Sequence, residues 1–388
     1  MATHTPVEAG SGPREASGSR LGLVAEPDLP HRVADHLVPR LEDDLGGGGW
    51  EVEVLEDAPT AGAESADAVL RETSRLRERH GWDYAVCLTD LPVRSTHHPV
   101  LGQVDVEGRV ALVSLPALGA VQPFRRSEQM VHRVVEDLLS PADRDGHAGL
   151  ARRGLTSPLT RLVAPIERTC DTGEAGERIR YVGTRGRGRA RLLGGMVRAN
   201  SPWRLVLGLS SALAAALAAS VFGLSSSTIW QIVTQLGPLR LGVTSLGAVG
   251  VLVAWLVATH GLWERPGRGS VRDREQAMFY NVSTLTTLTL GVAVMYAVLL
   301  VVNTGVAVLL VPSGFLGSTL GEGVTVDWRT YLALGWGFST MGLVAGALGS
   351  SLESDDDVRR AAYGYREQQR RTRRAETEDR QHPTEETR

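Results

Sequence analysis

The spacing of apolar residues over the first 140 positions predicts alternating strands and helices. Short apolar runs or strict apolar–polar alternation, both typical of strands, occur at 21–25, 50–55, 84–88, 100–106 and 109–115. Between these runs, apolar residues recur at helical spacing in the segments 30–45, 66–80 and 123–139. The order β-α-β-α-β-β-β-α therefore predicts an α/β domain over residues 21–140, which is long enough to enclose one hydrophobic core.

Further along the chain the pattern changes to long stretches that are apolar on all sides. Four stretches have about the 20 apolar residues that a helix needs to cross a bilayer core: 205–224, 241–262, 285–311 and 331–350. Helices buried in a large soluble enzyme are the alternative interpretation, but they rarely run this long without charge. The sequence therefore predicts a four-helix transmembrane bundle.

The distribution of charge separates the same two parts of the chain. The 388 residues include 41 basic and 44 acidic side chains, and the mean hydropathy is −0.06. Only 11 of these charged residues fall within 205–350. The average thus combines an apolar membrane part with a densely charged remainder.

The placement of arginine predicts the orientation of the helices. Arginines gather before the first apolar stretch, between the second and third, and after the fourth, whereas the other two loops contain only Arg240 and Arg329 as cations. Because positive loops stay on the cytoplasmic side, both termini are expected in the cytoplasm of a multi-pass protein of the cell membrane. The charged tail at 351–388 is then cytoplasmic as well.

Composition also excludes several chemistries. All 41 basic residues are arginine, so a Schiff-base lysine and a P-loop lysine are both absent, and no cofactor is expected. Cys87 and Cys170 are too few for a disulfide framework. The first 20 residues lack an apolar run after a basic start, so they predict a disordered lead and no cleavable signal peptide.

Residues 141–204 are rich in arginine, glycine and proline, which predicts a linker before the first membrane helix. Arginines beside a membrane helix are attracted to anionic headgroups. Nucleic acid is the weaker alternative for this segment, because it lacks interleaved aromatic residues. The residues expected to contact lipid headgroups are Arg185, Arg187, Arg189, Arg191, Arg198 and Arg204.

Small residues suggest how the membrane helices pack. Gly342, Gly346 and Gly349 form one small face on the fourth stretch, where a neighbouring helix can approach closely. The middle of each stretch contains no Asp, Glu, Lys or Arg, although carriers usually need ionisable groups there. A solute transporter would instead need a polar cavity around Thr287 or Asn303.

The N-terminal domain has a pattern similar to archaemetzincin-type metalloproteases. A strand ends in Thr89, Asp90 and Leu91, a hairpin ends at Leu115, and a long helix follows. Where that family has HExxH, this chain has His132 followed by Arg133 and, four positions on, Glu136. The resemblance implies the fold without a zinc site, and His132 and Glu136 are expected as a solvated pair on the helix face. An enzyme interpretation would require Asp90, His97, His98 and His132 to converge in one pocket.

Viewed whole, the chain resembles uncharacterised four-pass membrane proteins of actinobacteria. Some similar chains have been labelled methylenetetrahydrofolate dehydrogenase, but the catalytic lysine of those enzymes is missing from this lysine-free chain.

These observations predict a cytoplasmic α/β domain followed by a four-helix membrane anchor. The expected role is a scaffold, sensor or regulator that acts through protein partners or a homo-oligomer at the inner face of the membrane. The alternatives are a membrane-tethered enzyme, either hydrolase-like or a degenerate metalloprotease, and a small-solute transporter.

Overall fold

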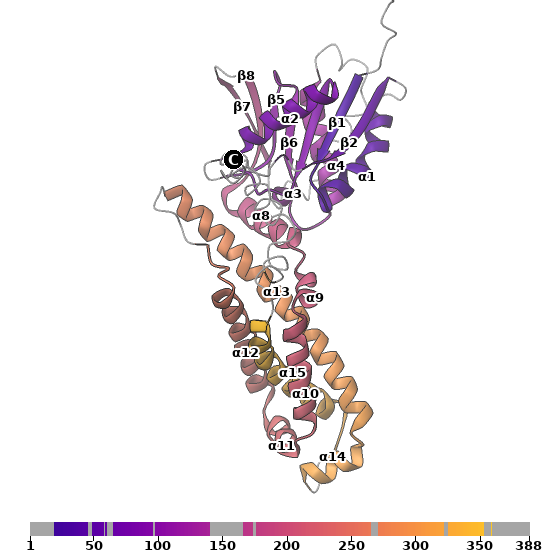
Figure 1. Cartoon of the computed structure of the whole chain (residues 1–388), viewed down its shortest axis with the longest axis vertical. Coiled ribbons are helices and arrows are strands. Elements are labelled where there is room, and N and C mark those ends of the chain that lie inside the picture. Colours follow the sequence, from indigo (N-terminus) through magenta and orange to yellow (C-terminus); the bar gives the residue numbers. More distant parts are fainter. Residues whose placement is uncertain are drawn as a thin grey trace, which may run out of the picture. The chain divides into compact units, whose positions relative to one another are not determined.

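A computed structural model describes residues 19–45, 49–57, 59, 65–95, 98–139, 166–173, 176–264, 271–321, 325–352 and 358. The chain divides into two compact units, Met1–Leu192 and Leu193–Arg388, which we call the N-terminal and C-terminal units (Figure 1). Residues 1–18 of the predicted lead, the linker up to residue 165 and almost all of the predicted tail lie outside the described residues, whereas Ser19 and Arg20, also assigned to the lead, begin a strand.

The N-terminal unit is built on a mixed sheet in the order β2-β1-β3-β6-β5-β8-β7, with the short β4 paired to β5. The strands β1, β2, β3 and β6 are parallel to one another, whereas β5, β7 and β8 pair antiparallel. Their bounds are β1 Ser19–Ala25, β2 Trp50–Glu56, β3 Tyr84–Thr89, β4 Arg94–Ser95, β5 His98–Asp105, β6 Val110–Ser114, β7 Ile166–Gly173 and β8 Gly176–Gly183.

Helices cover both faces of this sheet. Because β2 and β3 flank β1, right-handed crossovers place α1 (Leu29–Asp44) and α2 (Ala66–His80) on opposite faces. The helix α4 (Pro123–Leu138) packs beside α1, and the short α3 (Leu115–Leu118) precedes it. The strands and helices up to residue 139 lie where the apolar pattern predicts them, and the α/β fold of this part is confirmed.

The sheet continues into residues that composition assigned to the linker. β7 and β8 form a hairpin, and β8 pairs with β5 along residues 178–182. In β8, Ile179 and Tyr181 are buried and alternate with Arg178 and Arg180. This alternation is typical of a strand with one buried face, but the abundance of arginine and glycine around it hid the pattern.

Asp137, in the last turn of α4, attaches the hairpin to the rest of the unit. Its carboxylate accepts a hydrogen bond of 2.6 Å from the Tyr181 hydroxyl and one of 3.1 Å from the Arg168 guanidinium. Burial, together with the hydrogen bond to Asp137, raises the pKa of Tyr181 to about 12. Tyr181 therefore remains a protonated donor at neutral pH.

The C-terminal unit is helical. α8 (Arg185–Ala199) crosses the boundary between the units, and α13 is the longest helix. Within this unit α15 contacts α10, α11, α12 and α13 (Figure 1). The remaining bounds are α9 Leu205–Gly208, α10 Ser210–Leu224, α11 Ser227–Gln235, α12 Pro238–Thr259, α13 Val271–Leu310, α14 Ser313–Leu320 and α15 Trp328–Gly349.

Three of these helices are long and apolar enough to cross a membrane, within Pro238–Thr259, Ala277–Leu310 and Trp328–Leu352. A fourth crossing exists only if α10 and α11 count as one span, and these two helices are bent by 93°. The predicted first span at 205–224 is interrupted at Leu209, where the backbone leaves the helical region. The 15 residues of α10 measure about 22 Å, less than a bilayer core of about 30 Å.

The Asp137 contact predicts a local effect of Tyr181→Phe. Removal of the hydroxyl should destabilise the docked hairpin by about 1.5–3 kcal/mol, the usual cost of losing a hydrogen bond to a charged group. Hydrogen exchange of the full chain should therefore accelerate in peptides covering 166–183 and remain unchanged in β1 and β3. Equal protection of the hairpin in both proteins would contradict the assignment.

Candidate functional site

The carboxyl ends of the parallel strands form the first candidate site. In open α/β sheets ligands bind at this edge, where neighbouring connections leave in opposite directions. Here that point lies between β1 and β3. The connection after β1 runs to β2 on one side, and the connection after β3 runs to β5 and β6 on the other side. The residues that follow the two strands are Glu26 and Asp90, and both are buried.

Hydrogen bonds fix Glu26 in this position. One carboxylate oxygen accepts from the Thr89 hydroxyl at 2.8 Å and from the Asp90 backbone N–H at 2.9 Å. At the end of β6, which pairs with β3, the Ser114 hydroxyl donates to the carbonyl oxygen of Leu91 at 2.6 Å. These contacts hold the loops that follow β1 and β3 at one edge. Sequence reasoning included Asp90 but missed Glu26, although an acidic residue directly after a buried strand was the available indication.

His132 does not lie at this edge. His132 on α4 is buried, and its ring nitrogens lie 2.7 Å from the Glu128 carbonyl oxygen and 2.8 Å from Asp44 Oδ2. The expected solvated pair with Glu136 is therefore wrong for His132, because α4 packs this residue against α1. The helix α1 begins at the carboxyl edge of the sheet, after β1, and runs back to the opposite edge, where it ends at Asp44. His132 bonds to Asp44 and therefore lies near that opposite edge, away from Asp90.

Of the other two candidate histidines, the structure describes His98. His98 begins β5, and its Nδ1 lies 3.1 Å from the carbonyl oxygen of Gly183. β6 lies between β5 and β3, so a strand separates His98 from Asp90. His97 lies outside the described residues. Among the residues that the structure describes, no three His, Cys, Asp or Glu side chains are grouped to hold a metal.

The two cysteines are also separated. Cys87 is buried in β3, and burial raises the pKa of its thiol well above the ordinary value. Cys170 is exposed on β7, the edge strand of the sheet, and the strands β6, β5 and β8 lie between β7 and β3. Both thiols are free, and Cys87 has the environment of an unreactive core residue.

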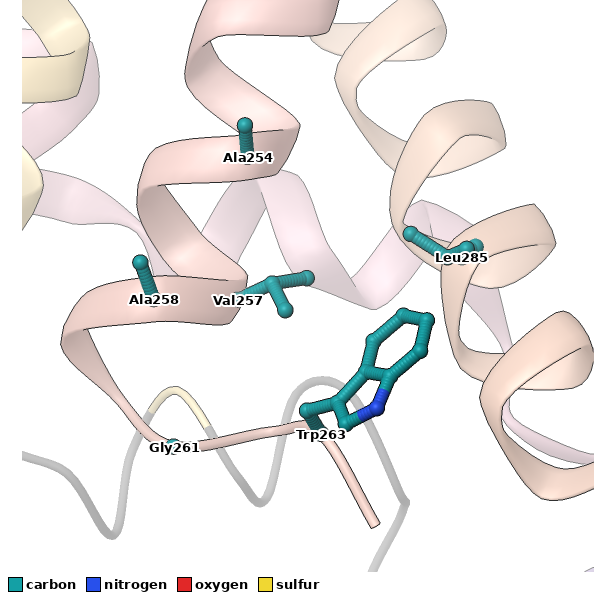
Figure 2. A pocket seen from close by; sticks show the side chains of 6 residues that line it. All are labelled: Ala254, Val257, Ala258, Gly261, Trp263 and Leu285. Carbon is teal, nitrogen blue, oxygen red and sulfur yellow. The ribbon is translucent and has the colours of Figure 1, made fainter. Parts of the chain in front are cut away.

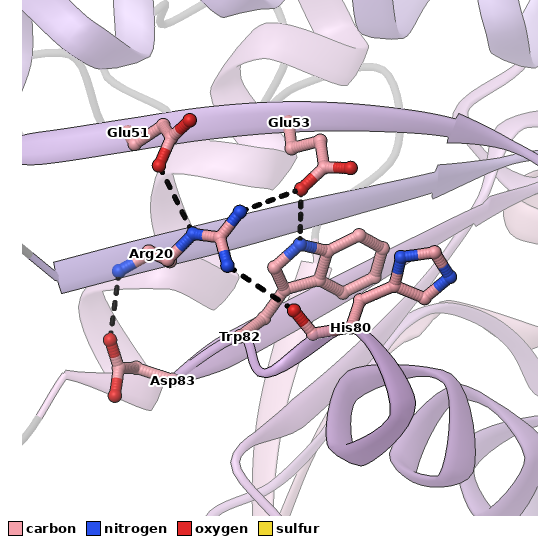
Figure 3. Close-up of polar contacts among 6 residues, drawn as sticks. All are labelled: Arg20, Glu51, Glu53, His80, Trp82 and Asp83. Carbon is pink, nitrogen blue, oxygen red and sulfur yellow. Dashed lines mark hydrogen bonds and ion pairs between the residues drawn. The ribbon is translucent and has the colours of Figure 1, made fainter.

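A second polar cluster lies where β1 begins (Figure 3). The Arg20 guanidinium donates to Glu51 at 3.0 Å and to Glu53 at 3.2 Å, and the Trp82 indole N–H donates to the same Glu53 oxygen at 2.7 Å. The backbone N–H of Arg20 donates to Asp83. These bonds connect β1, β2 and the turn before β3, so the cluster serves to join the strands.

The arginines expected at lipid headgroups differ in their surroundings. Arg185 and Arg187 are exposed, whereas Arg189 and Arg198 are half-buried. Arg191 packs within the N-terminal unit, where its Nε donates to the carbonyl oxygen of Ala117 at 2.9 Å. Its burial and the nearby charge of Arg126 lower its pKa to about 10. The side chain of Arg204 lies outside the described residues.

In the C-terminal unit, the glycine face of α15 lies against α10. We use this name for Gly342, Gly346 and Gly349. A Cβ at these positions would lie 2.7 Å from the Ala216 carbonyl oxygen, 3.0 Å from that of Ala212 and 2.6 Å from the Ala215 Cβ, respectively. Each distance is at or below the closest approach of a real methyl group, so the two backbones touch without intervening side chains.

Two polar networks connect the other helices to this pair. Asn303 of α13 donates to Ser220 of α10 and to Ser339 of α15, each at 3.0 Å. Ser245 of α12 lies 2.9 Å from both the Tyr296 hydroxyl of α13 and the Thr340 hydroxyl of α15. Thr287 is buried and accepts from Asn200 at 3.2 Å. Thr287 and Asn303, the residues that a transporter would need in a polar cavity, therefore bond to neighbouring side chains.

No protein-family model, curated protein or solved structure matches this chain.

The glycine face predicts opposite results for two Gly→Ala substitutions. Gly342→Ala should lower stability by about 1–3 kcal/mol, because the added methyl overpacks the α10–α15 contact. Gly247→Ala on α12 is the matched control, since nothing lies within 4 Å of its Cβ position. That change should be neutral or stabilising by up to about 1 kcal/mol. Unfolding midpoints of the full chain in mixed detergent micelles measure both, and equal midpoints would contradict the packing role.

Proposed function

We propose that this protein is an integral protein of the cytoplasmic membrane whose apolar helices anchor a cytoplasmic α/β domain. In this proposal the domain acts as a scaffold, sensor or regulator through protein partners at the inner face. The observation that carries the proposal is the combination of apolar helices long enough to span a bilayer with a packed, hydrogen-bonded interior. The positive loops support an orientation with both termini inside. That orientation needs an even number of crossings, so in this proposal α10 and α11 together make the fourth crossing.

The exterior of the C-terminal unit supports insertion into lipid. Large apolar side chains are exposed along several helices, among them Leu246 at 74%, Val301 at 73% and Leu309 at 82%. A water-soluble unit would pay the hydrophobic cost of these surfaces, whereas lipid chains would cover them. The same helices bury polar groups such as Asn303 toward the interior, which is the arrangement expected for membrane helices.

The interior favours an anchor over a transporter. The described parts of the spans carry no Asp, Glu, Lys or Arg in their middle. Asn303, Ser245 and Thr287 bond to side chains of neighbouring segments. A solute path would require these bonds to be exchanged for contacts with the solute. A packed bundle instead acts as an anchor that holds the domain at the membrane surface.

A membrane-tethered enzyme is the second candidate, and the carboxyl edge of the sheet favours it. Glu26, Thr89 and Asp90 are buried together at the position where α/β domains bind ligands. We also propose kinship with uncharacterised four-pass membrane proteins of actinobacteria and, for the N-terminal domain, with archaemetzincin-type metalloproteases.

The topology is tested with reporters fused to the full chain. Reporters active only in the cytoplasm should function after Arg388 and within 265–270, and should be silent after Gly237 and within 322–324. Reporters active only outside should give the reverse pattern. An external reading after Arg388, or release of the chain by alkaline carbonate, would contradict the proposed anchor.

The scaffold role is tested by crosslinking in native membranes followed by purification of the full chain. A scaffold or regulator should yield the same partner, or a second copy, in a fixed stoichiometry across crosslinker concentrations. A chain recovered only as a monomer, together with loss of a cellular reaction on substitution Glu26→Gln, would favour the enzyme instead.

A further inference from the structure

The end of α12 and a neighbouring part of α13 line a half-open apolar cavity of about 500 Å³, in which Ala254, Ala258 and Gly261 are exposed (Figure 2). Its wall on α12 is made of small side chains, so the helix leaves an open trough there. Figure 2 shows the Trp263 indole lying between the end of α12 and Leu285 of α13. The lining residues are Ala254, Val257, Ala258, Gly261, Trp263 and Leu285.

A reciprocal amide contact holds the aromatic wall in place. The buried side chain of Asn281 accepts from the Glu264 backbone N–H at 2.8 Å and donates to the Glu264 carbonyl oxygen at 2.9 Å. This pair fixes the chain immediately after Trp263 to α13. The indole therefore remains between the helices, and the cavity exists before any ligand arrives.

A positive charge lies on the same side of α13. Arg274 precedes Asn281 by seven residues and Leu285 by eleven, which correspond to about two and three helical turns. The three residues therefore share one face of the helix, with Arg274 about 16 Å along the axis from Leu285. Arg274 is exposed, so its guanidinium can reach toward the cavity mouth.

We propose that this cavity binds one acyl chain of an anionic phospholipid, whose phosphate faces Arg274. The inference rests on the proposed insertion into a membrane. The lining has the chemistry of hydrocarbon, and tryptophan is favoured at the depth where chains meet headgroups. An exposed arginine adds attraction for an anionic headgroup. A zwitterionic lipid would match the apolar wall but would gain less from the charge.

The proposal predicts that filling the cavity and removing the Arg274 charge have different effects on lipid retention. Native mass spectrometry of the full chain, titrated with phosphatidylglycerol or phosphatidylcholine, should show preferential retention of the first phosphatidylglycerol. Ala258→Phe should fill the cavity and weaken that retention on the order of tenfold, as displacement of about two buried methylenes would. Arg274→Gln should reduce the preference for phosphatidylglycerol roughly fivefold while phosphatidylcholine retention stays the same.

Two control substitutions test whether the loss of lipid is specific to the cavity and to Arg274. Ala297→Phe places the same ring on an exposed part of α13 that does not line the cavity, and Arg329→Gln removes an exposed arginine from another helix. Both should retain lipid like the unmodified chain. Equal loss in Ala258→Phe and Ala297→Phe, or no headgroup preference, would overturn the proposal. So would displacement of phosphatidylglycerol by inorganic phosphate, which would show a phosphate site without a chain.

The outcome is distinguishable from failure of the proposed anchor. A chain released from membranes by carbonate refutes the anchor. A chain that stays in the membrane but retains lipid equally in all variants refutes only the lipid site.

Discussion

The contact between the glycine face of α15 and the backbone of α10 is the interaction on which the C-terminal unit depends. Between apolar helices in lipid the hydrophobic effect supplies little attraction, so close van der Waals packing has to replace it. Gly342, Gly346 and Gly349 allow that packing because a side chain at each would meet α10. Once these helices touch, Ser220 and Ser339 come within reach of Asn303, and α13 is fixed to both.

The N-terminal unit is held together by a different kind of constraint. Its parallel strands β1, β3 and β6 are largely buried, and the polar groups at the strand ends are joined by side chains such as Glu26 at one edge and Arg20 at the other. Asp137 then attaches a hairpin that is distant in sequence. The unit is thus joined at three places by side chains that are far apart along the chain.

Much of the fold could be predicted because its determinants are local. The alternation in 50–55 and the helical spacing in 66–80 reflect which side chains face the core, and the structure has a strand and a helix there. The sequence does not predict the hairpin β7–β8, because its alternation is short and the residues that alternate with Ile179 and Tyr181 in β8 are arginines. His132 was placed on the surface because a single polar residue on a helix does not reveal Asp44, which is 88 positions away.

The sequence by itself determined where the chain is apolar, where it is charged and which segments alternate, since these depend only on residue order. It therefore predicted an α/β domain and the long apolar helices, together with the glycines available for packing. Only the tertiary structure decided which carbonyls those glycines meet, that α10 bends sharply into α11, and that Trp263 is held beside Leu285. The contacts of the glycines and of Trp263 join residues that are far apart along the chain, and no local pattern encodes such contacts.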